Sequence, residues 1–320
     1  MVAPQRRLSR QPASEAVGRR ATYSACMRIG LWIGGNRLED FVDSARQAKE
    51  AGFPSVWAGQ IFGLDTLTAF AVAGREVRGL EWGTGVVPIY PRHPIALAMQ
   101  ALTTNAAVDG HLTLGIGPSH QIVIETLHGL DYSRPASYTE EYLQALLPLL
   151  REGTVSFAGS HVTAHITLDP DKAFGVPVLL SALAPRMLRL AGAVADGTVT
   201  WMTGPKTVTT HVVPSIRAAA SEAGRPEPRV VMALPVAVTD DVAQARTRAG
   251  EIFSVYGGLP AYRAVLDREG AEGPGDVVIA GDAATVRAQI AELGESGVTE
   301  FVAVTFTERE RTMSALQKLL

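Results

Sequence analysis

Short apolar segments alternate with longer amphipathic ones from residue 27 to the end of this 320-residue chain. The apolar segments carry valine, isoleucine and tryptophan, which is typical of buried strands, and the segments between them have helical period. Strands are predicted at 28–33, 55–57, 81–87, 112–116, 176–182, 198–202, 229–238 and 300–305. Helices are predicted at 38–51, 66–77, 94–108, 138–150, 185–194, 206–223, 241–256, 283–293 and 309–319.

This alternation predicts the fold class. Strands that alternate with helices form a parallel sheet, and eight such units favour a closed (β/α)8 TIM barrel over an open sheet. Residues 153–168 have no helical pattern and are predicted to form a β insertion, 155–157 and 161–166, before strand five. Residues 257–275 are predicted to add a short helix around 262–267. Chemistry in such barrels lies at the C-terminal ends of the strands.

Composition restricts the class of protein further. The chain is 47% apolar with a net charge of −3, so nothing favours nucleic acid, and no apolar run has the length of a membrane span. Cys26 is the only cysteine, which excludes an internal disulfide and favours a cytoplasmic protein. His161 and His165 lie in a predicted strand, too far apart to share an ion, so no metal site is predicted.

Residues 1–26 differ from the rest of the chain. They contain five arginines and one acidic residue but no run of signal-peptide length. We expect a disordered N-terminal tail, or an extension translated from an upstream start, followed by one barrel domain at 27–320.

The end of the third predicted strand has an unusual composition. Gly85 directly precedes the apolar pair Val86 and Val87, and two prolines then prevent the strand from continuing. Pro94 suits the first position of the next helix, where a missing N–H costs nothing. We therefore predict a shaped bend that holds a ligand, with His93 capping the helix or orienting the ligand.

Other strand ends carry candidate functional groups. His120 follows two glycines at the end of strand four and suits proton transfer near neutral pH, although an ordinary loop histidine fits equally. Pro185 begins a helix, and the N-terminus of that helix together with Arg186 suits a phosphate group. The alternative is that Arg186 lies on the solvated face of the helix and binds nothing. Trp201 and Met202 offer apolar walls for a flat ring or belong to the core. Gln60 offers an amide to a ring edge or caps a loop.

These segments resemble a known family. Gly83-Thr-Gly-Val-Val-Pro with Arg92-His-Pro, His111-Leu-Thr-Leu-Gly-Ile-Gly117 and Pro185-Arg-Met-Leu-Arg-Leu-Ala-Gly192 resemble the luciferase-like monooxygenase superfamily, and within it the branch that uses the deazaflavin coenzyme F420. The resemblance runs from about residue 27 to the C-terminus. It implies a TIM barrel with an insertion before strand five and a non-prolyl cis peptide bond, which maps to Gly85–Val86.

The resemblance also implies roles. His120, with Tyr90 behind it, is the expected proton donor. Residues expected to bind the cofactor are Trp57, Gln60, Gly85, Val86, Val87, Gly117, Ser119, Ser181, Ala182, Ala184, Arg186, Trp201 and Met202. The phosphate loop of the family is rich in glycine, whereas residues 181–184 contain none, so side chains occupy space that a backbone cradle leaves open.

The leading hypothesis is thus an F420-dependent oxidoreductase that transfers a hydride to or from a small organic substrate. The alternatives are an FMN-dependent monooxygenase of the same fold and a flavin-binding protein without catalysis. The resemblance makes a homodimer possible, and the pattern names no substrate.

Overall fold

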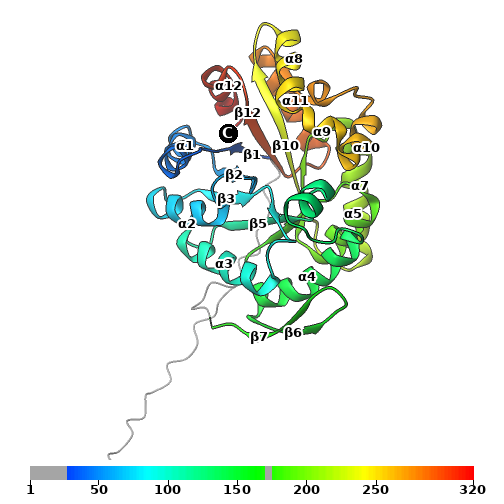
Figure 1. Cartoon of the computed structure of the whole chain (residues 1–320). Coiled ribbons are helices and arrows are strands. Elements are labelled where there is room, and N and C mark those ends of the chain that lie inside the picture. Colours follow the sequence, from blue (N-terminus) through cyan, green and yellow to red (C-terminus); the bar gives the residue numbers. More distant parts are fainter. Residues whose placement is uncertain (1–26, 170–174) are drawn as a thin grey trace, which may run out of the picture.

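Parallel strands form a closed barrel surrounded by helices in the computed structural model, which describes residues 27–169 and 175–320 (Figure 1). Within these residues, eight strands make the ring, each paired with the next. Pairing of β12 with β1 joins the ends of the chain, and pairing of β10 with β9 closes the ring. The ring strands are β1 (Arg28–Trp32), β2 (Ser55–Ala58), β3 (Glu81–Thr84), β5 (Leu112–Gly117), β8 (Val178–Leu180), β9 (Gly197–Trp201), β10 (Arg229–Val238) and β12 (Glu300–Thr305).

The helices cover the outside of the ring (Figure 1). Proline begins both α3 and α5 because its fixed φ suits the first helical position. The outer helices are α1 (Leu38–Glu50), α2 (Thr66–Glu76), α3 (Pro94–Ala107), α4 (Pro135–Arg151), α5 (Pro185–Val194), α6 (Pro205–Thr207) continued by η2 (Val208–Val212) and α7 (Val213–Glu222), α8 (Val242–Ile252), α11 (Ala283–Glu295), and α12 (Arg309–Leu316) continued by η4 (Gln317–Leu319). No described helix is long and apolar enough to cross a membrane.

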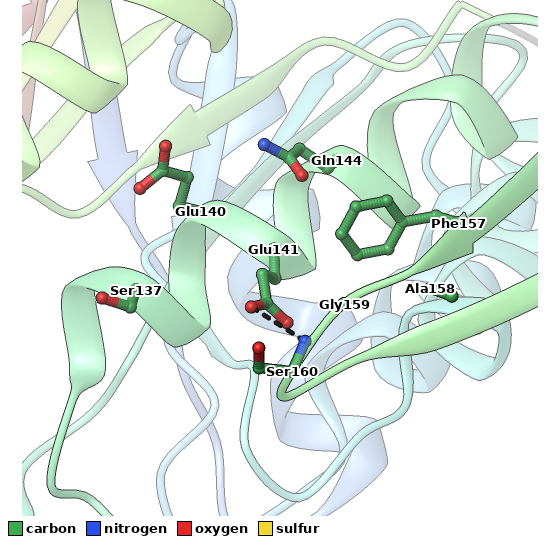
Figure 2. A pocket seen from close by; sticks show the side chains of 8 residues that line it. All are labelled: Ser137, Glu140, Glu141, Gln144, Phe157, Ala158, Gly159 and Ser160. Carbon is green, nitrogen blue, oxygen red and sulfur yellow. Dashed lines mark hydrogen bonds between the residues drawn. The ribbon is translucent and has the colours of Figure 1, made fainter.

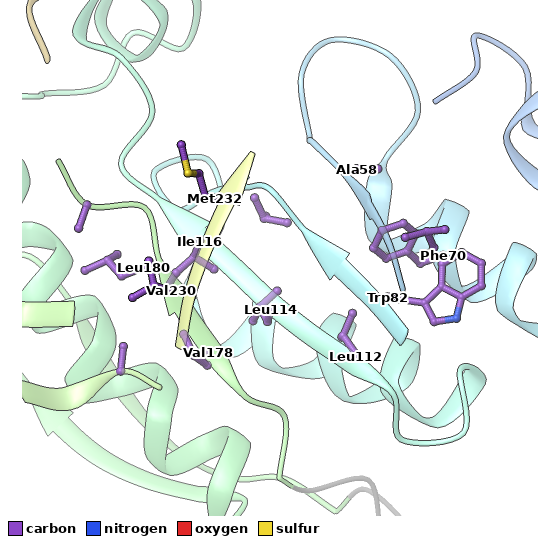
Figure 3. Packing of buried hydrophobic residues seen from close by; sticks show 14 of the residues in the cluster. Ala58, Phe70, Trp82, Leu112, Leu114, Ile116, Val178, Leu180, Val230 and Met232 are labelled. Atoms are coloured by element: carbon purple, nitrogen blue, oxygen red, sulfur yellow. The ribbon is translucent and has the colours of Figure 1, made fainter. Parts of the chain in front are cut away.

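Alternation along the strands separates two apolar layers. On β8, Val178 and Leu180 face the helices and belong to the large outer core, whereas Leu179 faces the barrel interior. Figure 3 shows the outer layer, where Trp82 of β3 packs near Phe70 of α2. The inner layer is small and consists of Trp57, Leu179, Val199, Val231, Ala233 and Val302. A packed interior leaves the strand ends as the place for a site.

The insertions follow the prediction in part. The β insertion is confirmed as an antiparallel hairpin of β6 (Thr154–Ala158) and β7 (Thr163–Thr167). The helix predicted at 241–256 divides at Phe253 into α8 and α9 (Ser254–Gly258), and α10 (Pro260–Glu269) follows it. A further strand, β11 (Ile279–Gly281), was not predicted: it follows η3 (Pro274–Val277) and pairs with the end of β10, outside the ring. The tail expected at 1–26 lies outside the described residues.

Candidate active site at the barrel mouth

A bulge interrupts the third ring strand at its C-terminal end. Gly83 of β3 pairs with Thr113, and Val87 of β4 (Val87–Pro88) pairs with Ile116, so three residues, 84–86, lie opposite two, 114–115. The single strand predicted over 81–87 is therefore wrong. The predicted cis peptide bond Gly85–Val86 is confirmed and lies within this bulge.

The extra residue reverses the alternation beyond it. Gly83 faces the interior, where an added Cβ would lie 2.4 Å from the ring of Trp57. A regular strand would then turn Val87 inward, but Val87 is fully buried in the outer core, and Val86 instead packs against the inner cluster. Val86 thus faces the mouth. Val87, which we expected to press on the same ring face, does not.

Side chains and amides from neighbouring strands hold the bulge. The Thr84 hydroxyl donates to the carbonyl of Gly115 (2.7 Å) and accepts from its N–H (2.8 Å), replacing ladder bonds that the bulge interrupts. On the other side, Gly85 N–H donates to the carbonyl of Ala58 (2.9 Å), and Gln60 N–H donates to the carbonyl of Val86 (3.2 Å). The bulge is therefore fixed to both neighbouring strands.

The segment after the bulge is held by Arg92 and His93. Arg92 pairs with Asp65 (2.5 Å), whose other oxygen accepts from Gln100 (2.7 Å). Hydrogen bonds from Thr68 and the Arg92 charge lower the pKa of Asp65 against the opposing effect of burial, which is the largest single influence. His93 accepts from Ile95 N–H (3.3 Å) and caps α3, as predicted.

Gln60 also has a capping contact. Its side-chain oxygen accepts from Thr66 N–H (2.7 Å) at the start of α2, which is the loop-capping alternative from the sequence.

The end of β5 forms the wall beside Val86. A Cβ on Gly117 would lie 3.1 Å from both Val86 Cγ2 and Ser181 Cβ, so glycine here lets both side chains approach the β5 backbone closely. Ser119 has a φ of 63°, and its carbonyl accepts from the Tyr132 hydroxyl (2.9 Å). His120 follows at once and its ring lies 5.7 Å from that of Tyr262. Burial lowers the pKa of His120, so the imidazole is neutral near pH 7.

A helix begins directly after His120: residues 121–127 are helical and end in the π-helical turn η1 (Val123–Leu127).

Tyr90 lies in a separate stack of tyrosines. Its ring centroid is 4.1 Å from that of Tyr138 and 5.3 Å from that of Tyr132. Burial raises the pKa of Tyr90 well above its ordinary value, so the phenol stays protonated at physiological pH. Tyr90 is connected to the His120 segment through its ring contact with Tyr132, whose hydroxyl donates to the Ser119 carbonyl. The roles expected of Tyr90 and His120 in proton transfer stay predictions.

The loop after β8 is the predicted phosphate site. Ser181 N–H donates to the carbonyl of Ile116 (2.8 Å), and Ala182 is buried. Ala184 is the N-cap of α5 and provides no side-chain cap. Arg186 is exposed and reaches Ser137 (3.1 Å) and Glu140 (3.3 Å) of α4. The helix N-terminus therefore suits an anion, while the Arg186 charge is already paired.

Aromatic rings close the remaining side of the mouth, and the sequence had identified only two of them. Trp32, at the end of β1, stacks on Trp201 at the end of β9, with centroids 6.2 Å apart. Trp201 contacts Tyr256 edge-on (5.8 Å), and Tyr256 contacts Tyr262 (4.9 Å), which meets His120. We call Trp32, Trp201, Tyr256, Tyr262 and His120 the aromatic belt.

Two expected cofactor contacts lie below the mouth. Trp57 is 1% exposed and its indole N–H donates to Glu300 (2.8 Å), so it fills the barrel interior. Met202 is fully buried in the outer core and has a φ of 50°. Neither side chain presents a surface to the mouth.

A hollow lies elsewhere on the described part of the chain. It has a volume of about 550 Å³ and lies between α4 and the β6–β7 hairpin, lined by Glu140, Glu141, Gln144 and Phe157 among others (Figure 2). Glu141 accepts from the N–H groups of Ser160 (3.1 Å) and Val162 (3.1 Å), which fixes the hairpin turn. The part of the chain that the structure describes contains no cluster of three potential metal ligands.

Known proteins share this architecture. The family model described as luciferase-like monooxygenase matches residues 20–300. A Mycobacterium tuberculosis protein named "Putative coenzyme F420-dependent oxidoreductase" is 25% identical, over 91% of this chain and 97% of its own. The 5,10-methylenetetrahydromethanopterin reductase of Methanolobus tindarius is 28% identical, over 71% of this chain and 69% of its own.

Solved structures agree on the fold. The coenzyme F420-dependent tetrahydromethanopterin reductase of Methanopyrus kandleri has a TM-score of 0.79 at 21% identity, covering 92% of this chain and 98% of its own. An F420-dependent secondary alcohol dehydrogenase, solved with an F420–acetone adduct, has a TM-score of 0.74 at 20% identity, with the same coverage. Since the family match spans most of the chain, this protein belongs to the luciferase-like monooxygenase family.

Proposed function

We propose that this protein is an oxidoreductase that binds coenzyme F420 at the barrel mouth and moves a hydride between it and a small organic substrate. The observation that carries the proposal is the bulge at 84–86, which turns Val86 toward the mouth beside the end of β5. Relatives named for F420-dependent reactions support the choice of cofactor.

The residues present fit a flat ring with a phosphate-bearing tail. Val86 offers an apolar surface, and the absence of a side chain at Gly117 lets Val86 and Ser181 lie close to the β5 backbone. The uncapped N-terminus of α5 provides backbone N–H groups and the positive end of the helix dipole for an anion. Ser181 and Ala184 would hold the tail, and Ser119 would bond the ring edge.

The chain itself contributes positioning and proton transfer. The bound deazaflavin supplies a carrier for one hydride. Bonds from Thr84, Ala58 and Gln60 keep the Val86 surface in place, which removes the need to order it when a ring binds. His120 is neutral near pH 7 and therefore suits accepting a proton from a substrate hydroxyl as it is oxidised. In the reverse direction the imidazolium would return that proton.

Titration of the purified protein with F420 tests the proposal. We expect saturable quenching of deazaflavin fluorescence at micromolar protein. Gly117→Val should weaken binding at least tenfold because its side chain would meet Val86 and Ser181. Gly250→Ala is the matched control, since a Cβ there meets open space.

Three results would contradict the proposal. The first is an absence of quenching at micromolar protein. The second is protein-dependent oxygenation of an organic substrate with reduced FMN and oxygen, which would favour the monooxygenase alternative. The third is tight F420 binding without turnover, together with a His120→Ala variant that behaves like the original protein. That result would indicate a binding protein without catalysis.

A further inference from the structure

The aromatic belt is a series of ring contacts that begins beside the bulge and ends in the loop after β5. Trp32 lies against Gly59 and Gly85, where an added Cβ would come within 3.1 Å and 2.9 Å of its ring. From Trp32 the ring contacts run through Trp201, Tyr256 and Tyr262 to His120. His120 follows β5, the strand that pairs with β4 directly after the bulge. Ring contacts therefore join the end of β1, beside the bulge, to the loop that follows β5.

The belt members differ in their distance from Val86. Trp32 and Trp201 pack on the same inner cluster as Val86, so they border the place proposed for the cofactor ring. Tyr256 of α9 and Tyr262 of α10 belong to the segment inserted after α8, and Tyr262 contacts His120. In this outer half of the belt Tyr262 is buried behind its neighbours, whereas Tyr256 and His120 are half-buried and can contact a second molecule.

The belt carries no charge at neutral pH. Burial raises the pKa of both Tyr256 and Tyr262 and lowers that of His120, so all three side chains stay neutral. Two of its members are also flanked by exposed apolar side chains. Ile122 and Val255 are each 63% exposed, next to His120 and Tyr256 respectively. Ring faces and aliphatic groups attract planar apolar molecules and provide nothing to replace the hydration of an anion.

We propose that the substrate class of this site is an uncharged, ring-containing apolar molecule that packs on the outer half of the aromatic belt, with its reacting carbon toward Val86. This inference rests on the proposed function for calling the molecule a substrate. Anionic compounds such as sugar phosphates are excluded from the same place.

Acetophenone and benzoate make a matched pair of probes, because both are a planar ring with a short substituent and only benzoate is charged. Their affinities are measured by ligand-observed NMR titration, with and without F420. We expect acetophenone to bind at least tenfold more tightly than benzoate. Tyr256→Ser should weaken acetophenone at least fivefold, and Tyr256→Phe should preserve binding because the ring remains. F420 affinity should change less than twofold in both variants.

Met99→Ser is the control, since Met99 is 55% exposed on α3, outside the belt, and should change neither affinity. Benzoate binding as tightly as acetophenone, no binding of either probe, or no effect of Tyr256→Ser would each overturn the inference. If F420 fails to bind while acetophenone behaves as described, the proposed function falls and the ring-binding site remains.

Discussion

His120 combines a ring contact with a lowered pKa. Because burial disfavours the imidazolium, the pKa lies below 6.5, and the neutral base required for substrate oxidation is present at pH 7 and lost as the pH falls through that pKa. We expect kcat for oxidation to decline on the acid side of neutrality. His120→Gln should lower kcat by about 10²-fold or more and remove this acid limb. A pH–rate profile of both proteins checks this, and an acid limb that persists in the variant would contradict it.

Glu300 is a buried carboxylate whose hydrogen bonds stabilise the fold. It is 1% exposed and accepts from Ser55 (2.5 Å), Trp57 (2.8 Å) and Arg229 (3.0 Å). Glu300→Ala would leave the buried Arg229 charge without this partner, which costs about 3–5 kcal/mol of unfolding free energy. Urea denaturation measures the loss. Glu310→Ala, at an exposed position on α12, should cost less than about 0.5 kcal/mol.

At the scale of elements, Thr84 joins β3 to β5 where their ladder is interrupted. Thr84→Val keeps the shape of the side chain but removes both bonds to Gly115, leaving a buried N–H and carbonyl without this partner. We expect a loss of about 2–4 kcal/mol and weaker F420 binding. Thr84→Ser keeps the hydroxyl and should recover most of both losses. Equal unfolding free energies for the Val and Ser variants would refute this role.

The strand and helix order could be predicted from the sequence because burial on a parallel sheet imposes a local period. β11 could not, since Ile279–Gly281 has only three residues and pairs with residues of β10 that lie 43 positions earlier. The location of the bulge came from the family resemblance. That resemblance did not reveal the reversed alternation, so Val87 was expected at the mouth although it faces the helices.

The aromatic belt could not be predicted from local sequence patterns either. Its contacts join the ends of β1, β9 and β5 to α9 and α10, segments that are separated by up to about 230 residues in the chain. No local pattern distinguishes such rings from ordinary core. Arg186 was expected at a phosphate, but Glu140 of α4 competes for its charge.

At the scale of the whole molecule, the two ends of the barrel differ in chemistry. Arg28, Glu81, Arg229 and Glu300 are each the first residue of a strand, and they form linked ion pairs at the N-terminal end. Trp32 and Trp201 are each the last residue of a strand, and they border the mouth. The charged end stabilises the ring, and the apolar end is left for binding.

This difference between the two ends predicts that the hollow beside α4 takes no part in catalysis (Figure 2). Gln144 lines it and is exposed on α4, so Gln144→Trp should fill part of its volume without disturbing the core. We expect F420 affinity and kcat to stay within twofold of the original protein, because the mouth is built from strand ends and not from the hairpin side of α4. Fluorescence titration and steady-state kinetics measure both quantities. A tenfold loss of F420 affinity or of kcat would indicate that the functional site lies in the hollow. Glu140 and Glu141 would then be the residues to substitute next.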